Sequence, residues 1–254
     1  MLYNFLSIMQ QDKNITQWFG VNLAQLLGEK IKLVYTDFNS HTYIDIIQKN
    51  CMNMSYSKRV ELHADALKIC LPQDYSTAIN ILMAILGEEN PHETGMFTHF
   101  YWIMPIGKFV EKYGREYFDI SIQAIEEITK RNTGEYAIRP YIRIYPEKTI
   151  HIMQWWSKSK NFHLRRLSSE GSRPKLPWAT KLEVFITDPQ PVFTILENLM
   201  QDDIRFVQKS VANNIADYLK VHTSFAVEYI KKYQNSDNKN TQWIIRYATR
   251  KTQV

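Results

Sequence analysis

Apolar residues recur at helical spacing along nearly the whole chain, and this periodicity restricts the fold more than any other feature of the sequence. In the run VELHADALKICL, for example, Val60, Leu62, Ala66, Leu67 and Cys70 fall on one side of a helix. Alternating, strand-like patterns are scarce, and prolines divide the chain into segments as long as one helix or a helix pair. The sequence therefore predicts an all-α protein.

Three segments in the second half of the chain align as the second helix of a repeated two-helix unit. HLRRLSSEG, FVQKSVANN and WIIRYATRK, aligned on Arg166, Lys209 and Arg246, are separated by 43 and 37 residues, a period typical of HEAT-like and armadillo-like repeats. EKTIHIMQWWSK, PVFTILENLMQ and TSFAVEYIKKYQ supply the first helices. We expect one repeat domain over residues 1–254, clearest over 146–254, stacked into a solenoid with a concave face.

Helix geometry separates the apolar and polar faces of these repeats. The apolar residues at four-residue steps beginning with Val207 must face the core, whereas Lys209 and Asp217 lie on nearly the opposite side. Each repeat thus presents one cation on a polar stripe, at Arg166, Lys209 and Arg246. Such a row suits successive phosphates of a nucleic acid, but it could equally solubilise an outer face.

The two halves of the chain differ in charge. Residues 1–130 contain 11 Lys and Arg against 15 Asp and Glu, and residues 131–254 contain 20 against 11, which gives net charges of −4 and +9. A basic half fits a domain that meets a polyanion such as DNA on its concave face. Basic patches also serve acidic proteins and membrane surfaces, so charge alone leaves the partner open.

Several classes of protein are not indicated. Cys51 and Cys70 lie outside any C-x-x-C arrangement, and the seven histidines form no H-E-x-x-H pattern, so we expect no disulfide framework, metal or cofactor. The apolar runs are too short to cross a bilayer, and MLYNFLSIMQQDKN lacks the features of a secretory signal. We therefore expect a cytoplasmic protein.

Glu170 is the residue that a purely structural interpretation explains least well. A carboxylate in the last turn of a helix faces the negative end of the helix dipole, which costs a few tenths of a kcal/mol up to about 1 kcal/mol. Arg166, one turn earlier, partly offsets this, and Gly171 is the expected C-cap. The prolines of RPKLP hold the next segment extended, so Trp178 could fold back beside Glu170 and Arg166.

Two further carboxylates could join this corner. Glu135 precedes Arg139 by one turn near the start of an expected helix, and Asp217 lies on the polar stripe of the following repeat. Carboxylates backed by an aromatic face suit a reaction that develops positive charge, such as cleavage of a glycosidic bond. Each residue also has an ordinary role open to it: a helix N-terminus for Glu135, a solvated surface for Asp217 and a core anchor for Trp178.

Four blocks carry a resemblance to a known family. They are GEYAIRPYI at 134–142, NFHLRRLSSEGSRPKLPWA at 161–179, SVANNIADYL at 210–219 and WIIRYA at 243–248. In these blocks the chain resembles the AlkC branch of the HEAT-like DNA alkylation repair glycosylases, which are related to the AlkD group. The resemblance extends more weakly over nearly the whole chain, and its most specific part runs from Arg165 to Trp178.

The resemblance implies a monofunctional DNA glycosylase of base excision repair. Such an enzyme releases cationic N-alkylated bases, 3-methyladenine and often 3-methylcytosine among them, from double-stranded DNA without a metal, a cofactor or a covalent lysine intermediate. We expect it to act as a monomer associated with the nucleoid through DNA. Carried over residue by residue, the implied catalytic residues are Glu135, Arg166, Glu170, Trp178 and Asp217. The expected DNA contacts are Arg139, Arg165, Arg173, Lys175, Lys209 and Arg246.

The chain also departs from the family pattern. Relatives usually continue through at least one more helix after the block that corresponds to WIIR, and some carry a C-terminal immunoglobulin-like domain, which we do not expect here. This departure bears on DNA affinity more than on chemistry. Two alternatives therefore stay open beside the glycosylase: a non-catalytic HEAT-like DNA-binding protein and a protein-interaction scaffold.

Overall fold

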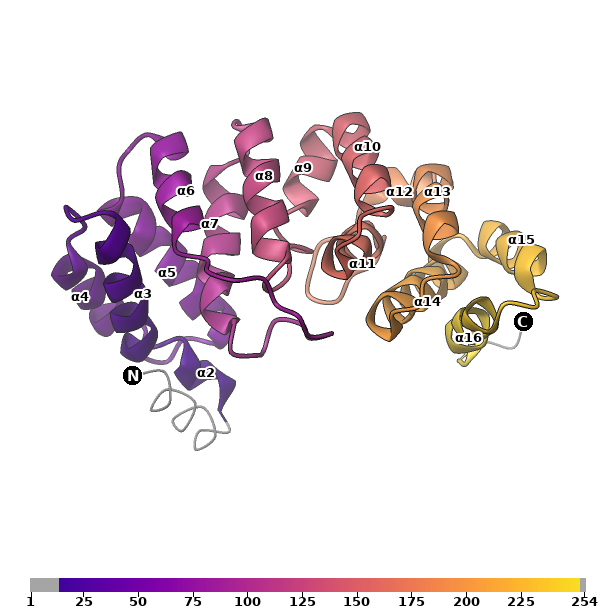
Figure 1. The fold of residues 1–254 in the computed structure, drawn as a ribbon, viewed down its shortest axis with the longest axis horizontal. Coiled ribbons are helices and arrows are strands. Elements are labelled where there is room, and N and C mark those ends of the chain that lie inside the picture. Colours follow the sequence, from indigo (N-terminus) through magenta and orange to yellow (C-terminus); the bar gives the residue numbers. More distant parts are fainter. Residues whose placement is uncertain (1–13, 252–254) are drawn as a thin grey trace. The chain divides into compact units, whose positions relative to one another are not determined.

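The computed structural model describes residues 14–251, and every regular element in this range is a helix (Figure 1). This confirms the all-α prediction. None of the described helices is long and apolar enough to cross a membrane. The expected absence of a secretory signal concerns mainly residues 1–13, outside the described range.

The chain forms two compact units, Met1–Asn90 with Gly95–Asn132, and Pro91–Thr94 with Thr133–Val254. The expectation of a single repeat domain stays a prediction.

The elements of the first unit are α2 (Ile15–Trp18), α3 (Val21–Val34), α4 (Ser40–Asn50), α5 (Tyr56–Cys70), α6 (Tyr75–Ala84), the 3-10 turn η1 (Tyr101–Ile103), α7 (Met104–Tyr113) and α8 (Phe118–Thr129). The helices pack in neighbouring pairs, among them α3 with α4, α4 with α5, α5 with α7 and α6 with α8.

Helix α5 shows how the apolar pattern translates into burial. Val60, Ala66 and Leu67 are buried as the periodicity predicts, whereas Leu62 and Cys70 are only half-buried. The centre of this face is instead occupied by His63, which is fully buried and lies 2.7 Å from the hydroxyl of Tyr43 through its Nδ1. Burial lowers the pKa of His63 to about 4, because a charged imidazole is unstable without water.

The second unit contains the predicted repeats. Its helices are α9 (Arg139–Ile144), α10 (Pro146–Trp156), α11 (Phe162–Gly171), α12 (Glu183–Thr187), α13 (Gln190–Leu199), α14 (Arg205–Val221), α15 (Thr223–Tyr233) and α16 (Lys239–Thr249). The predicted first helices are α10, α13 and α15, and the predicted second helices are α11, α14 and α16. Figure 1 shows the second helices following one another on one side of this unit, and α14 packs against both α11 and α16.

The core of the second unit lies between the two rows of helices. The four-residue series that begins at Val207 is buried to its last member, Leu219, which confirms the predicted core face of α14. Of the two adjacent tryptophans in α10, Trp156 is fully buried and Trp155 remains 66% exposed. Because α11 and α14 pack side by side, the polar residues near the end of α11 meet the polar face of α14.

Candidate active site

Glu170 is the penultimate residue of α11 and points into the protein. The helix begins at the Asn161 cap, whose side chain accepts a hydrogen bond from the backbone N–H of His163. Glu170 is only 7% exposed. A buried carboxylate at the negative end of a helix needs compensation from its surroundings, and the structure supplies it in two ways.

The first way is hydrogen bonding to the last carbonyls of α11. The Ser172 hydroxyl donates to the carbonyls of Ser168 and Ser169, at 2.8 and 3.0 Å. Asn214, on α14, donates to the Ser169 carbonyl at 2.7 Å through its side-chain Nδ2. These bonds satisfy the acceptors that a helix end leaves open and weaken the negative potential around Glu170.

The role predicted for Gly171 needs correction. The glycine is the last helical residue, and the C-cap is Ser172 with φ −85°, so no left-handed conformation occurs there. A Cβ at position 171 would instead lie 2.7 Å from Cγ2 of Ile138 and 3.3 Å from Cε of Met153. Glycine is therefore required because the end of α11 packs directly against neighbouring side chains.

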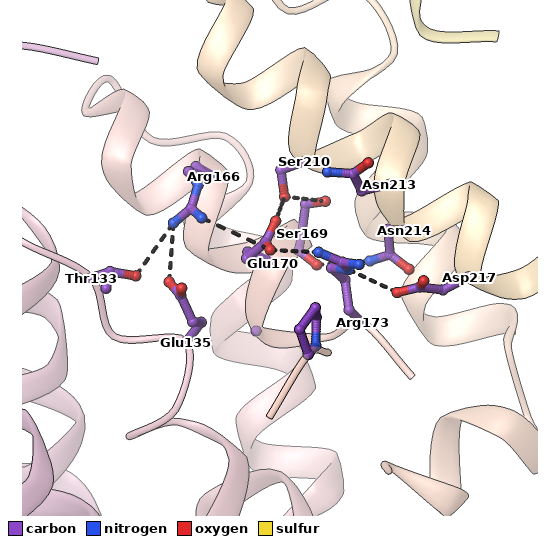
Figure 2. A network of polar contacts seen from close by, with 12 residues as sticks. Thr133, Glu135, Arg166, Ser169, Glu170, Arg173, Ser210, Asn213, Asn214 and Asp217 are labelled. Atoms are coloured by element: carbon purple, nitrogen blue, oxygen red, sulfur yellow. Dashed lines mark hydrogen bonds and ion pairs between the residues drawn. The ribbon is translucent and has the colours of Figure 1, made fainter. Parts of the chain in front are cut away.

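The second way is a set of donors that converge on the carboxylate of Glu170 (Figure 2). Arg173 Nη1 donates to Oε1 at 2.7 Å, and Arg166 Nη2 lies 3.9 Å from the same oxygen. The Ser210 hydroxyl, on α14, donates to Oε2 at 2.6 Å. Both oxygens of the carboxylate are therefore held, each from a different direction.

Arg166 links Glu170 to the second predicted carboxylate. Its Nη1 donates to Oε2 of Glu135 at 3.0 Å and lies 3.3 Å from the hydroxyl oxygen of Thr133. The guanidinium also stacks over the ring of Phe206, 4.4 Å from its centroid, an arrangement that leaves its N–H edges free for the carboxylates. Glu135 itself is 4% exposed.

Arg173 links Glu170 to the third carboxylate. Its Nε donates to Oδ2 of Asp217 at 2.8 Å, while Nη1 bonds Glu170. Arg173 and Asp217 are 8% and 7% exposed. We call Glu135, Arg166, Glu170, Arg173 and Asp217 the carboxylate–arginine network. With every group ionised, its three carboxylates and two guanidiniums carry one net negative charge.

Burial is the largest influence on the pKa of all three carboxyls, and it acts upward because a desolvated carboxylate is unstable. It raises the pKa of Asp217 despite the hydrogen bond and charge of Arg173, and it raises the pKa of Glu135 despite Arg166. For Glu170 the charges of both arginines, together with the hydrogen bonds from Ser210 and Arg173, outweigh burial and hold the pKa below its ordinary value. Glu170 is therefore a persistent negative charge in a buried position.

Trp178 lies outside this network. Its side chain is 84% exposed and its φ is +59°, a backbone conformation that is uncommon for a bulky residue. The hydroxyl of Tyr136 donates to the carbonyl of Pro177 at 3.3 Å and ties down the preceding residue. The expected packing of the indole against Glu170 and Arg166 is not what the structure shows, because the chain turns the ring toward solvent.

The six residues expected to contact DNA occupy different environments. Lys175, Lys209 and Arg246 are exposed, form no ion pair with any residue of the range 14–251, and stay predicted DNA contacts. Arg165 is held by Asp202 through Nε at 2.6 Å and Nη2 at 3.2 Å. Its Nη1 donates to nearby carbonyls.

Arg139 and Arg173 are placed inside the protein instead. Arg139 is 2% exposed and donates to the carbonyls of Gly171 and Arg173 at 3.2 and 2.8 Å and to that of Thr180 at 2.6 Å. It therefore supports the end of α11, and burial, together with nearby Arg143 and Arg173, lowers its pKa to about 10. The guanidinium of Arg173 bonds two carboxylates, so both arginines serve internal contacts where a phosphate contact was expected.

Sequence reasoning missed several partners of the carboxylates. Ser210 and Asn214 precede Asp217 by seven and three residues on α14, so all three share a face, and this run of small polar residues was a usable signal. Thr133 gave no comparable signal, because its position beside Arg166 depends on the loop before α9. No group of three or more His, Cys, Asp or Glu side chains within the described residues is arranged to hold a metal ion.

Comparisons with known proteins agree with this architecture. The sequence pattern of the family described as DNA alkylation repair enzyme matches residues 106–252. The Bacillus subtilis protein YhaZ, described as uncharacterized, is 33% identical over 238 residues, which are 93% of this chain and 64% of YhaZ.

The solved structures that resemble this one include the following two. The Pseudomonas fluorescens alkylpurine DNA glycosylase AlkC, bound to DNA containing an abasic site analog, matches with a TM-score of 0.84 and 30% identity over 94% of this chain. AlkD2 from Streptococcus mutans matches 78% of this chain and 90% of its own length with a TM-score of 0.56 and 20% identity, and so shares the fold. The chain spans 64% of the length of both YhaZ and AlkC.

Proposed function

The chain belongs to the family of DNA alkylation repair enzymes, and from this premise we propose that it is a DNA glycosylase. It hydrolyses the N-glycosidic bond of cationic N-alkylated bases, with 3-methyladenine as the first expected substrate and 3-methylcytosine as the second. The observation that carries this proposal is the convergence of Glu135, Glu170 and Asp217 in one buried network. The likeness to AlkC, described as an alkylpurine DNA glycosylase, supports the same reaction class.

The chemistry needs little more than a place for positive charge to develop. When the C1′–N bond breaks, its electron pair moves to the base and neutralises the base, while the sugar becomes an oxocarbenium ion. Water then adds to C1′ and gives up a proton to a carboxylate or to solvent. A base that already carries a positive charge is a good leaving group and needs no strong general acid, so stabilising the sugar cation is the main task.

The roles within the network follow from charge and position. Glu170 keeps its negative charge because Arg166 and Arg173 lower its pKa, so we assign it to stabilising the oxocarbenium ion. Asp217, with a pKa raised by burial, is the better proton acceptor and positions the water. Glu135 supports the site through Arg166, and the network contains no lysine that could form a covalent intermediate.

Trp178 and the free cations fit the binding of damaged DNA. An exposed indole held in an unusual backbone conformation can stack on a base or pack against a cationic one. Lys175, Lys209 and Arg246 are exposed and form no ion pair with any other described residue, so they are available to backbone phosphates. The proposed partner is therefore double-stranded DNA that contains alkylated bases.

The experiment that tests this function is base release from methylated duplex DNA by the purified chain. Free 3-methyladenine and 3-methylcytosine are measured for wild type, Glu170→Gln and Glu147→Gln. Glu170→Gln removes the charge and keeps the shape, so we expect a loss of about 100-fold or more in the single-turnover rate with DNA affinity near wild type. Glu147 is exposed in the first turn of α10, and its variant is expected to keep full activity.

The outcomes separate the alternatives. Release by wild type and Glu147→Gln, with little by Glu170→Gln, supports the glycosylase and the role of Glu170. Salt-sensitive binding of duplex DNA without release by any variant would instead indicate a non-catalytic DNA-binding protein. If the chain neither binds duplex DNA nor releases a base, the proposal is overturned and the protein-interaction scaffold is the remaining alternative.

A further inference from the structure

Ser210 connects two neighbouring repeats through a hydrogen bond to Glu170. It lies on α14 and is 2% exposed, and its hydroxyl reaches the Oε2 atom of Glu170, on α11, at 2.6 Å. Its Oγ also lies 3.0 Å from Oγ of Ser169. A serine hydroxyl has one hydrogen, and an ionised carboxylate can only accept. The Ser210 hydrogen is therefore donated mainly to Oε2 of Glu170, the shorter contact, and Oγ of Ser169 is a second acceptor of the same hydrogen.

No other donor reaches Oε2 of Glu170 among the residues of the described range. Both arginines lie on the side of Oε1, where Arg173 Nη1 is at 2.7 Å and Arg166 Nη2 at 3.9 Å. Ser210 thus fixes the rotation of the carboxylate plane, because the guanidiniums alone hold only one oxygen. Removal of the hydroxyl would leave a buried acceptor unpaired and free the carboxylate to rotate toward the arginines.

A neighbouring serine provides a contrast within the same few ångströms. Ser172 is fully buried and its hydroxyl donates to the carbonyls of Ser168 and Ser169, without contact to the carboxylate of Glu170. Ser172 therefore stabilises the end of α11, whereas the hydroxyl of Ser210 acts on the charged group itself. Substitutions at these two serines therefore distinguish a loss of stability at the end of α11 from the loss of a hydrogen bond to the Glu170 carboxylate.

We propose that Ser210 is a positioning residue for Glu170, which holds Oε2 from the neighbouring repeat so that the carboxylate presents a fixed charge to the reacting sugar. This inference rests on the proposed function and deepens it. This role makes the orientation of the Glu170 carboxylate depend on the packing of α14 against α11, which are adjoining helices of two repeats.

The test compares Ser210→Ala, Ser210→Cys and Ser172→Ala with wild type. Both substitutions at 210 remove the strong donor, and Cys retains most of the volume. We expect each to lower the single-turnover rate of base release about 10-fold or more, since hydrogen bonds to charged groups are among the stronger ones in proteins, while the Kd for lesion DNA stays within about 2-fold of wild type. Ser172→Ala removes only hydrogen bonds to the carbonyls of α11, so it should lower thermal stability and reduce the rate much less than either substitution at 210.

A second measurement asks whether Ser210 acts through Glu170. In the Glu170→Gln background the substitution Ser210→Ala should add little further loss, measured as release above the spontaneous rate. Carbon-13 NMR titration of the Glu170 side chain gives a readout independent of activity, and its pKa should move upward in Ser210→Ala.

The results distinguish failure of this inference from failure of the proposed function. A wild-type rate in Ser210→Ala, an equal loss in both backgrounds, or an unchanged titration of Glu170 would overturn the positioning role. A wild-type chain that releases no base, with the expected shift in the Glu170 titration, would overturn the glycosylase and leave only the hydrogen bond.

Discussion

Removal of the Arg173 guanidinium is expected to destabilise the second unit more than any other single truncation in the carboxylate–arginine network. Arg173 bonds Glu170 and Asp217 at 2.7 and 2.8 Å, and all three residues are at least nine-tenths buried. Arg173→Met keeps much of the volume and leaves two carboxylates in a buried site. Breaking one buried ion pair from one side costs about 3–5 kcal/mol, so we expect a loss of unfolding free energy of at least that order at pH 8.

The penalty should depend on pH in a definite direction. Without the guanidinium, burial is less opposed, so the folded-state pKa of Glu170 and Asp217 should rise above the unfolded values. A group with a raised folded-state pKa binds protons more readily when folded, so acidification stabilises the folded variant relative to the unfolded chain. The difference between Arg173→Met and wild type should therefore shrink as the pH falls from 8 to 5.

The assay is urea unfolding at several pH values, combined with hydrogen exchange of peptides from α11 and α14. Hydrogen exchange assigns the loss to the second unit, which matters because two compact units need not unfold together. Lys209→Met is the matched control, because Lys209 is exposed on α14 and its loss should change stability by less than about 0.5 kcal/mol. A penalty below about 1 kcal/mol, or one that is constant between pH 8 and 5, would refute the reasoning.

Two further predictions concern packing and burial. Gly171→Ala should destabilise the second unit by about 1–3 kcal/mol because the new Cβ would lie 2.7 Å from Ile138. Gly107→Ala is the control: in α7 the nearest atom to the new Cβ is at 4.0 Å, so this variant should raise the melting temperature slightly. Equal changes in stability for the two variants would contradict the close approach at Gly171. The first unit should lose about 3 kcal/mol of stability between pH 6.5 and pH 4, because the unfolded state protonates His63 while burial keeps the folded-state pKa at about 4. Chemical unfolding followed by hydrogen exchange in α5 measures this loss of stability. His63→Gln should flatten the dependence of stability on pH. If the pH profile of that variant matched wild type, His63 would be ruled out as the source of the pH dependence.

Local sequence patterns were sufficient for the helices and for the assignment of residues to faces. The four-residue apolar series in α14 is buried as predicted, and the three second helices lie where the aligned cations placed them. Helix geometry also put Arg166 beside Glu170, because that contact spans one turn of one helix. Such relations depend only on residues that are close in sequence.

The network itself was decided by tertiary packing. Glu170 meets Ser210 only because α11 packs against α14, and Arg166 meets Glu135 only because the loop before α9 lies beside α11. The same packing turned Arg139 and Arg173 inward, made Gly171 a point of close contact and left Trp178 in solvent.

The physical reason for this division lies in the range of each interaction. Periodicity and helix capping act within a few residues, so the amino-acid sequence by itself determined that this chain forms helices, which of their faces are apolar and which charged residues each repeat offers. Burial, pairing and the pKa of a carboxyl depend on groups 30 to 45 residues away in sequence, such as the contact between Arg173 and Asp217. Only the tertiary structure decided which charges from distant segments meet, and hence which carboxylate keeps its charge.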